Sequence, residues 1–445
     1  MKAFIRTEAL AGDTFEEDLF ERKETAESLI GLIEGLDQPI SIALDGSWGS
    51  GKSVFLKKFS DLADERLRVV SFDAYSVDFY ESAFLALSSE INKSFRDSQA
   101  KSKRFRVEAG KVAGMIARAS GRIAIRAATA GIIEQTDIEA ATEEAFKSAG
   151  EAVDRAYADA LKRVEAEGDI RKGFKEALEA LVLSEHSGDA GHGKLVIIVD
   201  ELDRCNPIFA LSLIESAKHF FNIDGVYFLF ALNKAEFLKV VEGAYGQGFN
   251  SQTYVEKFFD VTISLHPIES GSASDRERYA RFLWENMGFD SDFSTEYYDA
   301  SGLLLWVSEA NDLPFRSMER LFSEYALMLL RAGKNSPQHD QILVPLAFMA
   351  SHKRELISKI MDGKTNGHDI VLNVLEGNRK VATGSAIKEI GKDVRNLWSV
   401  MIMPTEELSK IRPNTDQSRA LVQLNGRHPL PGLENLRSYI STFAN

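Results

Sequence analysis

The stretch "GSWGSGKS" at 46–53 constrains the fold of this chain more than any other feature. Its spacing fits G-x-x-x-x-G-K-[ST], from Gly46 to Lys52 and Ser53. Glycine permits positive φ and close approach of the backbone, so consecutive N–H groups can curl around a phosphate. We expect Lys52 to reach the β- and γ-phosphates of a nucleotide and Ser53 to hold Mg²⁺. The residues expected to bind the nucleotide are Gly46, Ser47, Trp48, Gly49, Ser50, Gly51, Lys52, Ser53 and Val54.

A phosphate loop needs a strand before it and a helix after it, and the flanking sequence supplies both. Upstream, "PISIALDG" is a short apolar run with β-branched residues. Downstream, "KSVFLKKFSDLADERL" spaces Phe55, Phe59 and Leu62 as on one face of a helix. A glycine turn in a β-hairpin is the alternative, but such a turn does not require Lys-Ser at its end. The context therefore predicts a strand–loop–helix unit.

Further apolar runs predict the other strands of the fold. "LVIIV" precedes Asp200, "GVYFLFALN" covers 225–233, and "FDVTISL" covers 259–265. These runs are apolar on both faces, as is typical of central strands in a parallel sheet. Their alternation with helical patterns predicts an α/β fold with a doubly wound parallel sheet.

We place the domain boundaries at the points where strand-like sequence patterns give way to helical ones. The sequence between about 97 and 190 is rich in Ala, Arg, Lys and Glu and predicts a helical insertion. Beyond 270 the pattern is helical. We expect five segments: the first part of the core at 1–96, the insertion at 97–190, the second part of the core at 191–268, a helical lid at 269–335 and a C-terminal helical region at 336–445.

Composition limits the classes of protein to which the chain can belong. Its 445 residues suggest about two or three domains. A net charge of −14 argues against a protein that coats nucleic acid with its whole surface. A single cysteine excludes an intramolecular disulfide and fits a reducing compartment. Because we find neither a signal peptide nor a run long enough to span a bilayer, we expect a cytoplasmic protein without membrane spans.

The acidic end of "VIIVDE" predicts the second half of a hydrolytic site. Asp200 follows a buried strand, where we expect it to bind Mg²⁺ and its waters near the phosphate loop. Glu201 comes next, in the position of a general base that polarises the attacking water. A strand that merely ends in surface acids is the alternative.

Two further polar residues are candidates for contact with the γ-phosphate. Asn233 ends the run "YFLFALN" and either holds the lytic water or caps the helix that begins "KAEFLKVV". Arg316 opens a helix in the C-terminal half and is a candidate sensor of the phosphates, with Arg320 one turn later as its competitor. A solvated helix arginine is the alternative for both.

Together these residues resemble the KAP family of P-loop NTPases, a branch of the additional-strand class. "GSWGSGKS" fits the family's G-x-W-G-x-G-K-[ST], which accounts for Trp48, and "DELDRC" at 200–205 fits its acidic strand end. The resemblance implies that Asp203 and Arg204 also belong to the site. It extends to "YVEKFFDVTISLHP" at 254–267, which is similar to the family's last core strand. "LPFRSMERL" is similar to the family's arginine helix, except that Phe315 separates proline from arginine.

The resemblance implies an ATPase that uses ATP and Mg²⁺ and couples the nucleotide state to conformational change or assembly. It also suggests a protein partner and a role in bacterial antiphage defence. Two alternatives stay open: a nucleotide-gated scaffold with little turnover, and an initiator-type AAA+ ATPase that acts on DNA. A homo-oligomer is a further expectation, with Arg204 and Arg316 as candidates for an arginine that completes the site of a neighbouring subunit.

Cations gather at the start of the insertion, over 101–126, in an otherwise acidic chain. Arg118, Arg122 and Arg126 are spaced by four, so they form one stripe on a helix. Ile116, among others, lies opposite them. Three interpretations are open: a helix that packs on its small and apolar residues, a contact with nucleic acid, and a helix that lies on a membrane surface.

Overall fold

The computed structural model describes ten segments of the chain: 14–64, 66–95, 99–129, 165–183, 193–265, 274–296, 299–332, 337–376, 385–417 and 419–420. The chain divides into two compact units. We call the first the sheet unit; it comprises Arg22–Gly46 and Lys52–Leu265. We call the second the helical unit; it comprises Met1–Glu21, Ser47–Gly51 and His266–Asn445.

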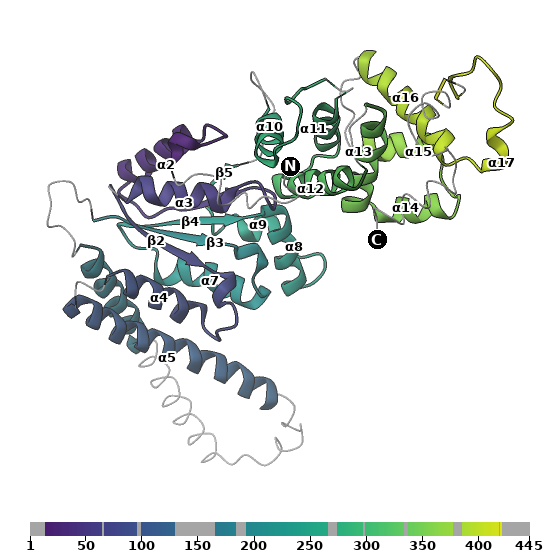
Figure 1. Ribbon diagram of the computed structural model, residues 1–445. Coiled ribbons are helices and arrows are strands. Elements are labelled where there is room, and N and C mark those ends of the chain that lie inside the picture. Colours follow the sequence, from purple (N-terminus) through teal and green to yellow (C-terminus); the bar gives the residue numbers. More distant parts are fainter. Residues whose placement is uncertain are drawn as a thin grey trace, which may run out of the picture. The chain divides into compact units, whose positions relative to one another are not determined.

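Five parallel strands form the sheet, in the order β2-β3-β4-β1-β5 (Figure 1). The predicted parallel α/β fold is therefore confirmed. The strand before the phosphate loop, β1, pairs with β4 on one side and β5 on the other, so β4 separates it from β3. This insertion of a strand defines the additional-strand arrangement. The strands are β1 (Ser41–Asp45), β2 (Arg68–Asp73), β3 (Leu195–Asp200), β4 (Val226–Leu232) and β5 (Val261–Ser264).

The central strands are buried because helices cover both faces of the sheet. Every residue of β4 is buried, and so is every residue of β3 before Asp200. Figure 1 shows α2 and α3 over one face and α4 and α7 over the other. Such two-sided burial explains why these strands are continuous apolar runs. The helices of this unit are α2 (Lys23–Gly35), α3 (Lys52–Ala63), α4 (Ala83–Ser94), α5 (Gln99–Thr129), α7 (Pro207–Phe220), α8 (Lys234–Tyr245) and α9 (Ser251–Val255).

The two ends of the predicted insertion are anchored in the core of the sheet unit. Phe105 from α5 and Phe174 from a helix over 165–182 have ring centroids 5.4 Å apart. Phe174 also contacts Phe84 of α4 and Phe221, which follows α7. All four rings are fully buried. The start and end of the insertion thus belong to the same hydrophobic cluster as the sheet; residues 130–164 lie outside the described part.

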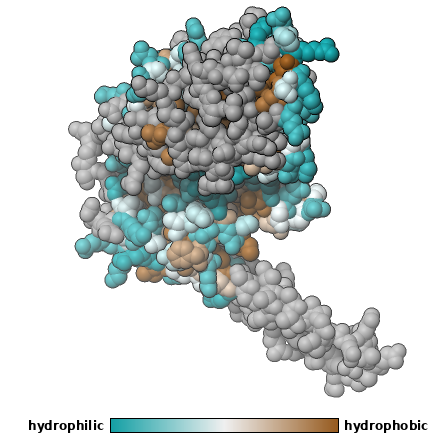
Figure 2. All heavy atoms as spheres, turned by 45° about the vertical axis from the view of Figure 1, so that its right-hand side comes forward, coloured by the Kyte–Doolittle hydropathy of each residue, from teal (hydrophilic) through white to brown (hydrophobic). Residues whose placement is uncertain are grey.

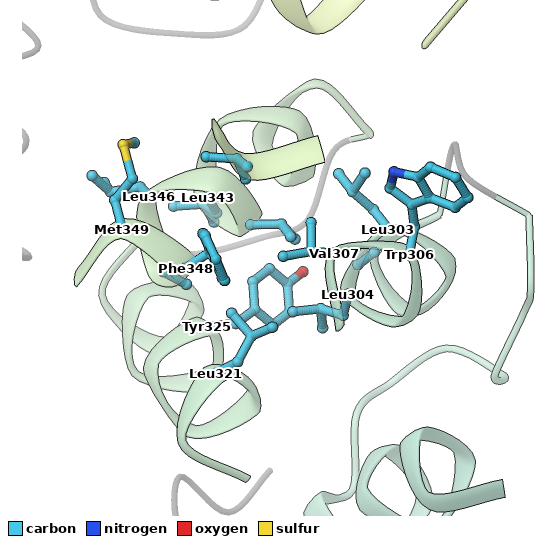
Figure 3. Packing of buried hydrophobic residues seen from close by; sticks show 14 of the residues in the cluster. Leu303, Leu304, Trp306, Val307, Leu321, Tyr325, Leu343, Leu346, Phe348 and Met349 are labelled. Carbon is cyan, nitrogen blue, oxygen red and sulfur yellow. The ribbon is translucent and has the colours of Figure 1, made fainter. Parts of the chain in front are cut away.

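One hydrophobic cluster also holds the helical unit together. Figure 3 shows Tyr325 of α12 among Leu304, Val307, Leu321 and Phe348. Helices on both sides of residue 335, α12 and α13, pack in this cluster. The helices are α10 (Asp275–Met287), α11 (Ala300–Ala310), α12 (Phe315–Ala332), α13 (Pro337–His352), α14 (Arg354–Met361), α15 (Gly367–Ile370), α16 (Ser385–Met401) and α17 (Thr405–Leu408), with a π-helical turn over Val371–Glu376.

A buried carboxyl makes the stability of the helical unit depend on pH. Tyr325 Oη donates to Asp340 Oδ1 at 2.6 Å, and burial, helped by the charge of Asp299, raises the pKa of Asp340 to about 6. Because the folded pKa exceeds the ordinary value, this contribution to stability is complete below about pH 4 and is lost as pH rises through about 6.

We expect Asp340→Asn to stabilise the protein above pH 7. The amide oxygen of Asn accepts the same hydrogen bond without a charge to bury, so the expected gain is roughly 1–3 kcal/mol, vanishing near pH 4. Urea unfolding between pH 4 and 8 measures this. Asp362→Asn, at an exposed position of the same unit, is the control, and an equal effect of both variants contradicts the assignment.

Candidate nucleotide site

The phosphate loop has the predicted strand before it and the predicted helix after it. β1 ends at Asp45 and α3 begins at Lys52. Gly49 and Gly51 have φ of 78° and 87°, the left-handed region that favours glycine. Ser50 N–H donates to Ser47 O at 3.1 Å, which closes a turn inside the loop. Gly49 and Gly51 therefore adopt the positive φ angles that the motif predicted.

Within the helical unit, Gly49 lies against the start of α12. A Cβ added to Gly49 would lie 2.8 Å from Arg316 Cβ and 3.2 Å from its backbone nitrogen. Arg316 follows Phe315, which is buried and stacks on Phe20 with ring centroids 4.5 Å apart. Phe315, which separates proline from arginine in this sequence, thus anchors the start of α12. The next residue, Arg316, contacts the phosphate loop at Gly49.

Arg320, the competing arginine, acts on another group. Its positive charge adds to the effect of burial, which lowers the pKa of His352 to about 4. Both arginines are exposed. Only Arg316 has its backbone against the loop, so Arg316 is the better placed of the two candidate sensors.

Lys52 is a buried cation at the first position of α3. It is 9% exposed, and its Nζ donates to Gly46 O at 2.5 Å. Burial lowers the pKa of the ammonium. Three carboxylates act in the opposite direction and favour its charged form, those of Asp203, Asp200 and Asp45. Buried charges in proteins are paired, and here a carbonyl oxygen and three carboxylates surround the ammonium at the end of the glycine-rich loop.

Asp45 is a charged neighbour of Lys52 that the sequence analysis did not single out. It ends β1, and its Oδ1 accepts from Lys234 N–H at 2.9 Å, which ties β1 to the start of α8. Its charge also acts on Lys52. The available signal was an acidic residue directly before Gly46 at the end of an apolar run.

The acidic strand end is built around an unusual backbone conformation. Glu201 has φ 58° and ψ 29°, a left-handed conformation that costs a non-glycine residue about 1 kcal/mol or more. Its N–H donates to Asp200 Oδ1 at 2.8 Å. Its carboxylate pairs with Arg204, with 2.8 Å between Oε1 and Nη1. Strain of this kind persists where the surrounding structure holds it, and it is frequent at functional sites.

Two neighbours complete this turn. Asp203 is buried, and its charge acts on Lys52, so the residue implied by the family resemblance does lie near this lysine. Cys205 is a buried thiol whose pKa burial raises to about 12, so it stays protonated at neutral pH. Its Sγ–H donates to Glu201 O at 3.5 Å.

Asn233 caps a helix. Its side-chain oxygen accepts from Glu236 N–H at 3.3 Å at the start of α8. The capping interpretation is therefore observed, whereas contact with a γ-phosphate stays a prediction. Asn233 follows β4, which lies between β1 and β3 in the sheet. Its position is therefore between the phosphate loop after β1 and the acidic residues at the end of β3.

The donor set fits a magnesium ion held jointly with a nucleotide. Ser53 is exposed on the first turn of α3, and Asp200 ends β3. Mg²⁺ takes oxygen ligands, keeps several waters and is bound in such sites by one or two carboxylates plus substrate phosphates. In the part of the chain that the structure describes, three or more His, Cys, Asp or Glu side chains nowhere gather as a metal site of their own.

The predicted basic helix exists as α5, and its first half packs on the core. Phe105, Ala109 and Val112 are buried there, and Ile116 packs against the same cluster. The predicted packing on small and apolar residues is thus observed for this half. Arg118 is exposed, and its Nε donates to Gly114 O at 3.0 Å. The side chains of 119–129 lie outside the described part.

On the face drawn in Figure 2, most coloured residues are hydrophilic, and the hydrophobic ones are scattered. Among the helices in the described ranges, none combines the length and hydrophobicity that crossing a membrane requires.

The sheet order, the glycine-rich loop and the buried lysine define the class of this protein as a P-loop nucleoside-triphosphate-binding protein of the additional-strand type. The KAP family P-loop domain matches residues 22–296, which is more than half of the chain. The chain belongs to this family, and the predicted resemblance is confirmed. A search of curated proteins found no similar sequence.

Proposed function

We propose that this KAP-family NTPase binds ATP with Mg²⁺ and hydrolyses it. The observation that carries the proposal is the buried Lys52 ammonium, whose surrounding carboxylates stand at the ends of β1 and β3 and in the turn after β3. Three carboxylates around one ammonium leave an excess of negative charge, so a phosphate enters this site most favourably with its own counter-cation, as a magnesium–nucleotide complex does.

The residues divide the work of hydrolysis between them. Backbone N–H groups of the loop and the Lys52 ammonium bind the β- and γ-phosphates. Ser53 and Asp200 would hold Mg²⁺, which supplies neutralisation of the phosphate charge. Glu201 accepts a proton from water as the water oxygen bonds to the γ-phosphorus. The bond to the bridging oxygen breaks, its electron pair leaves with ADP, and the proton passes on to solvent.

Arg316 is the residue that we propose as the link to conformational change. Its Cβ lies only 2.8 Å from the position that a Cβ on Gly49, in the phosphate loop, would take. A loop that rearranges around a γ-phosphate therefore meets α12 directly. The alternative is a scaffold that binds ATP and turns it over rarely; the carboxylate of Glu201 directly after Asp200 favours hydrolysis, since a switch that never hydrolyses has little need of it.

The purified protein is expected to hydrolyse ATP when Mg²⁺ is present and to lose that activity in EDTA. Phosphate release with ATP and with GTP, each with and without Mg²⁺, measures this. Ser53→Ala is expected to raise the Mg²⁺ concentration needed for half-maximal activity, because a ligand oxygen is lost. Tight ATP binding without turnover favours the scaffold, and no binding of either nucleotide contradicts the proposal.

A second contact is proposed for the outer face of α5, with nucleic acid. Lys101, Lys103, Arg106 and Arg118 are exposed on this helix and, among the described residues, none of the four forms an ion pair with a carboxylate. Clustered cations of this kind bind phosphates by releasing counterions. The described outer face carries no aromatic side chain of the type that anchors helices at membrane interfaces, so we favour nucleic acid.

The salt dependence of binding tests this contact. We expect the triple variant Lys103→Gln, Arg106→Gln, Arg118→Gln to weaken binding to double-stranded DNA and to reduce the slope of log K against log salt by roughly 2–3. The control replaces three exposed lysines of the helical unit with glutamine: Lys359, Lys364 and Lys410. Equal losses in both variants contradict a specific surface, and binding to anionic vesicles alone favours the membrane interpretation.

A further inference from the structure

The turn after α11, which leads into α12, contains a left-handed residue that is not glycine. Asp312 has φ 52°. Its N–H donates to Glu309 O at 3.1 Å, and the N–H of Leu313 donates to Ser308 O at 2.9 Å. These two hydrogen bonds define a Schellman motif, which closes the end of a helix and usually has glycine at the left-handed position. Aspartate adopts this conformation less readily than glycine, which indicates that its side chain has a role of its own.

The side chain of this aspartate pairs with a buried arginine of α10. Asp312 Oδ1 accepts from Arg276 Nη2, and Leu313 O accepts from Arg276 Nε at 3.1 Å. Arg276 is 4% exposed. One guanidinium therefore binds two consecutive residues of the turn. Because its donors form a rigid planar fork, the pair fixes the turn relative to α10.

The same face of α10 also holds the start of α12. Tyr279 follows Arg276 by three positions, and residues three apart are neighbours on one face of a helix. The Tyr279 ring packs on Phe315, with ring centroids 4.7 Å apart, and its Oη donates to Glu319 Oε1. Two side chains of α10 therefore fix the turn and the start of α12, which lies against the phosphate loop.

We propose that Arg276 and Asp312 are positioning residues, which hold the start of α12 against the phosphate loop and keep the loop in the form that binds a nucleotide. This role rests on the proposed binding of a nucleotide by the loop. The contact that transmits it is close, since a Cβ on Gly49 would lie 2.8 Å from Arg316 Cβ. Without the pair, the start of α12 is held less firmly, and a smaller fraction of the protein has the loop in its binding form.

Asp312→Gly is expected to weaken nucleotide binding without loss of the fold. Glycine keeps the left-handed turn and removes only the carboxylate. We expect Kd and KM for ATP with Mg²⁺ to rise roughly three- to tenfold, because apparent affinity falls with the binding-competent fraction. Saturating ATP draws the loop into its binding form, so kcat stays within about twofold. Asp312→Asn restores most of the affinity, since asparagine tolerates positive φ and its amide oxygen still accepts from the guanidinium.

Hydrogen exchange without ATP separates this inference from the proposed function. Mass spectrometry follows amide exchange in the nucleotide-free full chain, in peptides that cover 46–56 and 305–320. We expect exchange in both peptides to be about threefold faster or more in Asp312→Gly, and close to the unsubstituted rate in Asp312→Asn. An effect on the turn alone would stay within 305–320. If the protein fails to bind ATP, the proposed function fails, and exchange in 46–56 still judges the pair.

Asn414→Gly is the matched control. Asn414 is another exposed residue of the helical unit with positive φ, 62°, so this change also places glycine at a left-handed position. It is expected to leave KM and the exchange of 46–56 unchanged. Arg276→Lys is the second variant: it keeps the buried charge but cannot reproduce the fork of donors, so it should loosen the loop as Asp312→Gly does. Thermal unfolding shows which variants retain the fold.

Three results overturn the inference. Unchanged exchange of 46–56 in folded Asp312→Gly or Arg276→Lys shows that the pair does not hold the phosphate loop. An equal increase in Asn414→Gly shows that the effect is not specific to this turn. Exchange in Asp312→Asn as fast as in Asp312→Gly shows that the hydrogen bond to the guanidinium is not what holds the loop.

Discussion

Replacing Glu201 with glutamine is expected to lower ATP turnover about 10²–10⁴-fold while ATP binding changes only a few-fold. Glutamine keeps the size of the side chain but can neither accept a proton nor form the ion pair with Arg204, so the loss measures the whole contribution of the Glu201 carboxylate. The backbone bond of residue 201 to Asp200 Oδ1 does not involve the side chain and is retained. Single-turnover hydrolysis and nucleotide binding by fluorescence titration measure the two quantities separately.

Glu242→Gln is the control for this substitution, since Glu242 is an exposed carboxylate on α8. Its turnover is expected to stay within about twofold of the unsubstituted protein, as is usual for surface changes. Turnover by Glu201→Gln at the unsubstituted rate would show that another group activates the water. Because the variant holds ATP, it is also the form in which to capture a protein partner from cells.

The central strands were predictable from the sequence because they are buried on both faces, whereas β5 lies at the edge of the sheet and is mostly exposed, unlike the two-sided apolar strand expected over 259–265. "LVIIV" and "YFLFAL" correspond to β3 and β4, which have no solvent-facing side to require polar residues. The loop was predictable because a phosphate cradle demands glycines at fixed places, and Gly49 and Gly51 have the φ that only glycine adopts readily.

The contacts that complete the site were beyond the reach of local patterns. That β4 lies between β1 and β3 depends on pairing between segments more than 150 residues apart, such as Asp45 with Leu232. The fit of Gly49 against Arg316 likewise joins distant segments. Strand periodicity reports burial and says nothing of which strand is the neighbour. The sequence could therefore indicate which residues were candidates for the nucleotide site, but not which of them are in contact in the folded protein.

The pairing of Arg204 with Glu201 was missed for a different reason. The two residues are three positions apart, and the family resemblance placed both in the site. Their contact depends on the left-handed conformation of Glu201 and the 3-10 turn after it, and a non-glycine residue gives no local signal for positive φ. The surrounding fold imposes this backbone conformation, so the identity of residue 201 alone does not predict it.

Removal of the Lys52 ammonium is expected to weaken nucleotide binding about 10²-fold or more. Each charge-assisted hydrogen bond to a phosphate contributes roughly 1.5–3 kcal/mol, and Lys52 is placed to bind two phosphates. The loss of charge also leaves the carboxylates of Asp45, Asp200 and Asp203 without their buried counter-cation, so they repel the incoming triphosphate. Isothermal titration of Lys52→Ala with ATP and Mg²⁺ measures the effect.

The control for Lys52→Ala is Lys57→Ala, an exposed lysine on the same helix. Thermal unfolding of both variants separates loss of the site from loss of the fold, because Lys52 also binds Gly46 O and its removal frees that carbonyl. Lys52→Met, which keeps the apolar stem in the buried position, is the second variant: it should fold as the unsubstituted protein does and still fail to bind ATP. Binding of ATP by a folded Lys52→Met chain at the unsubstituted affinity would remove Lys52 from the phosphate site, and with it the observation on which the proposed function rests.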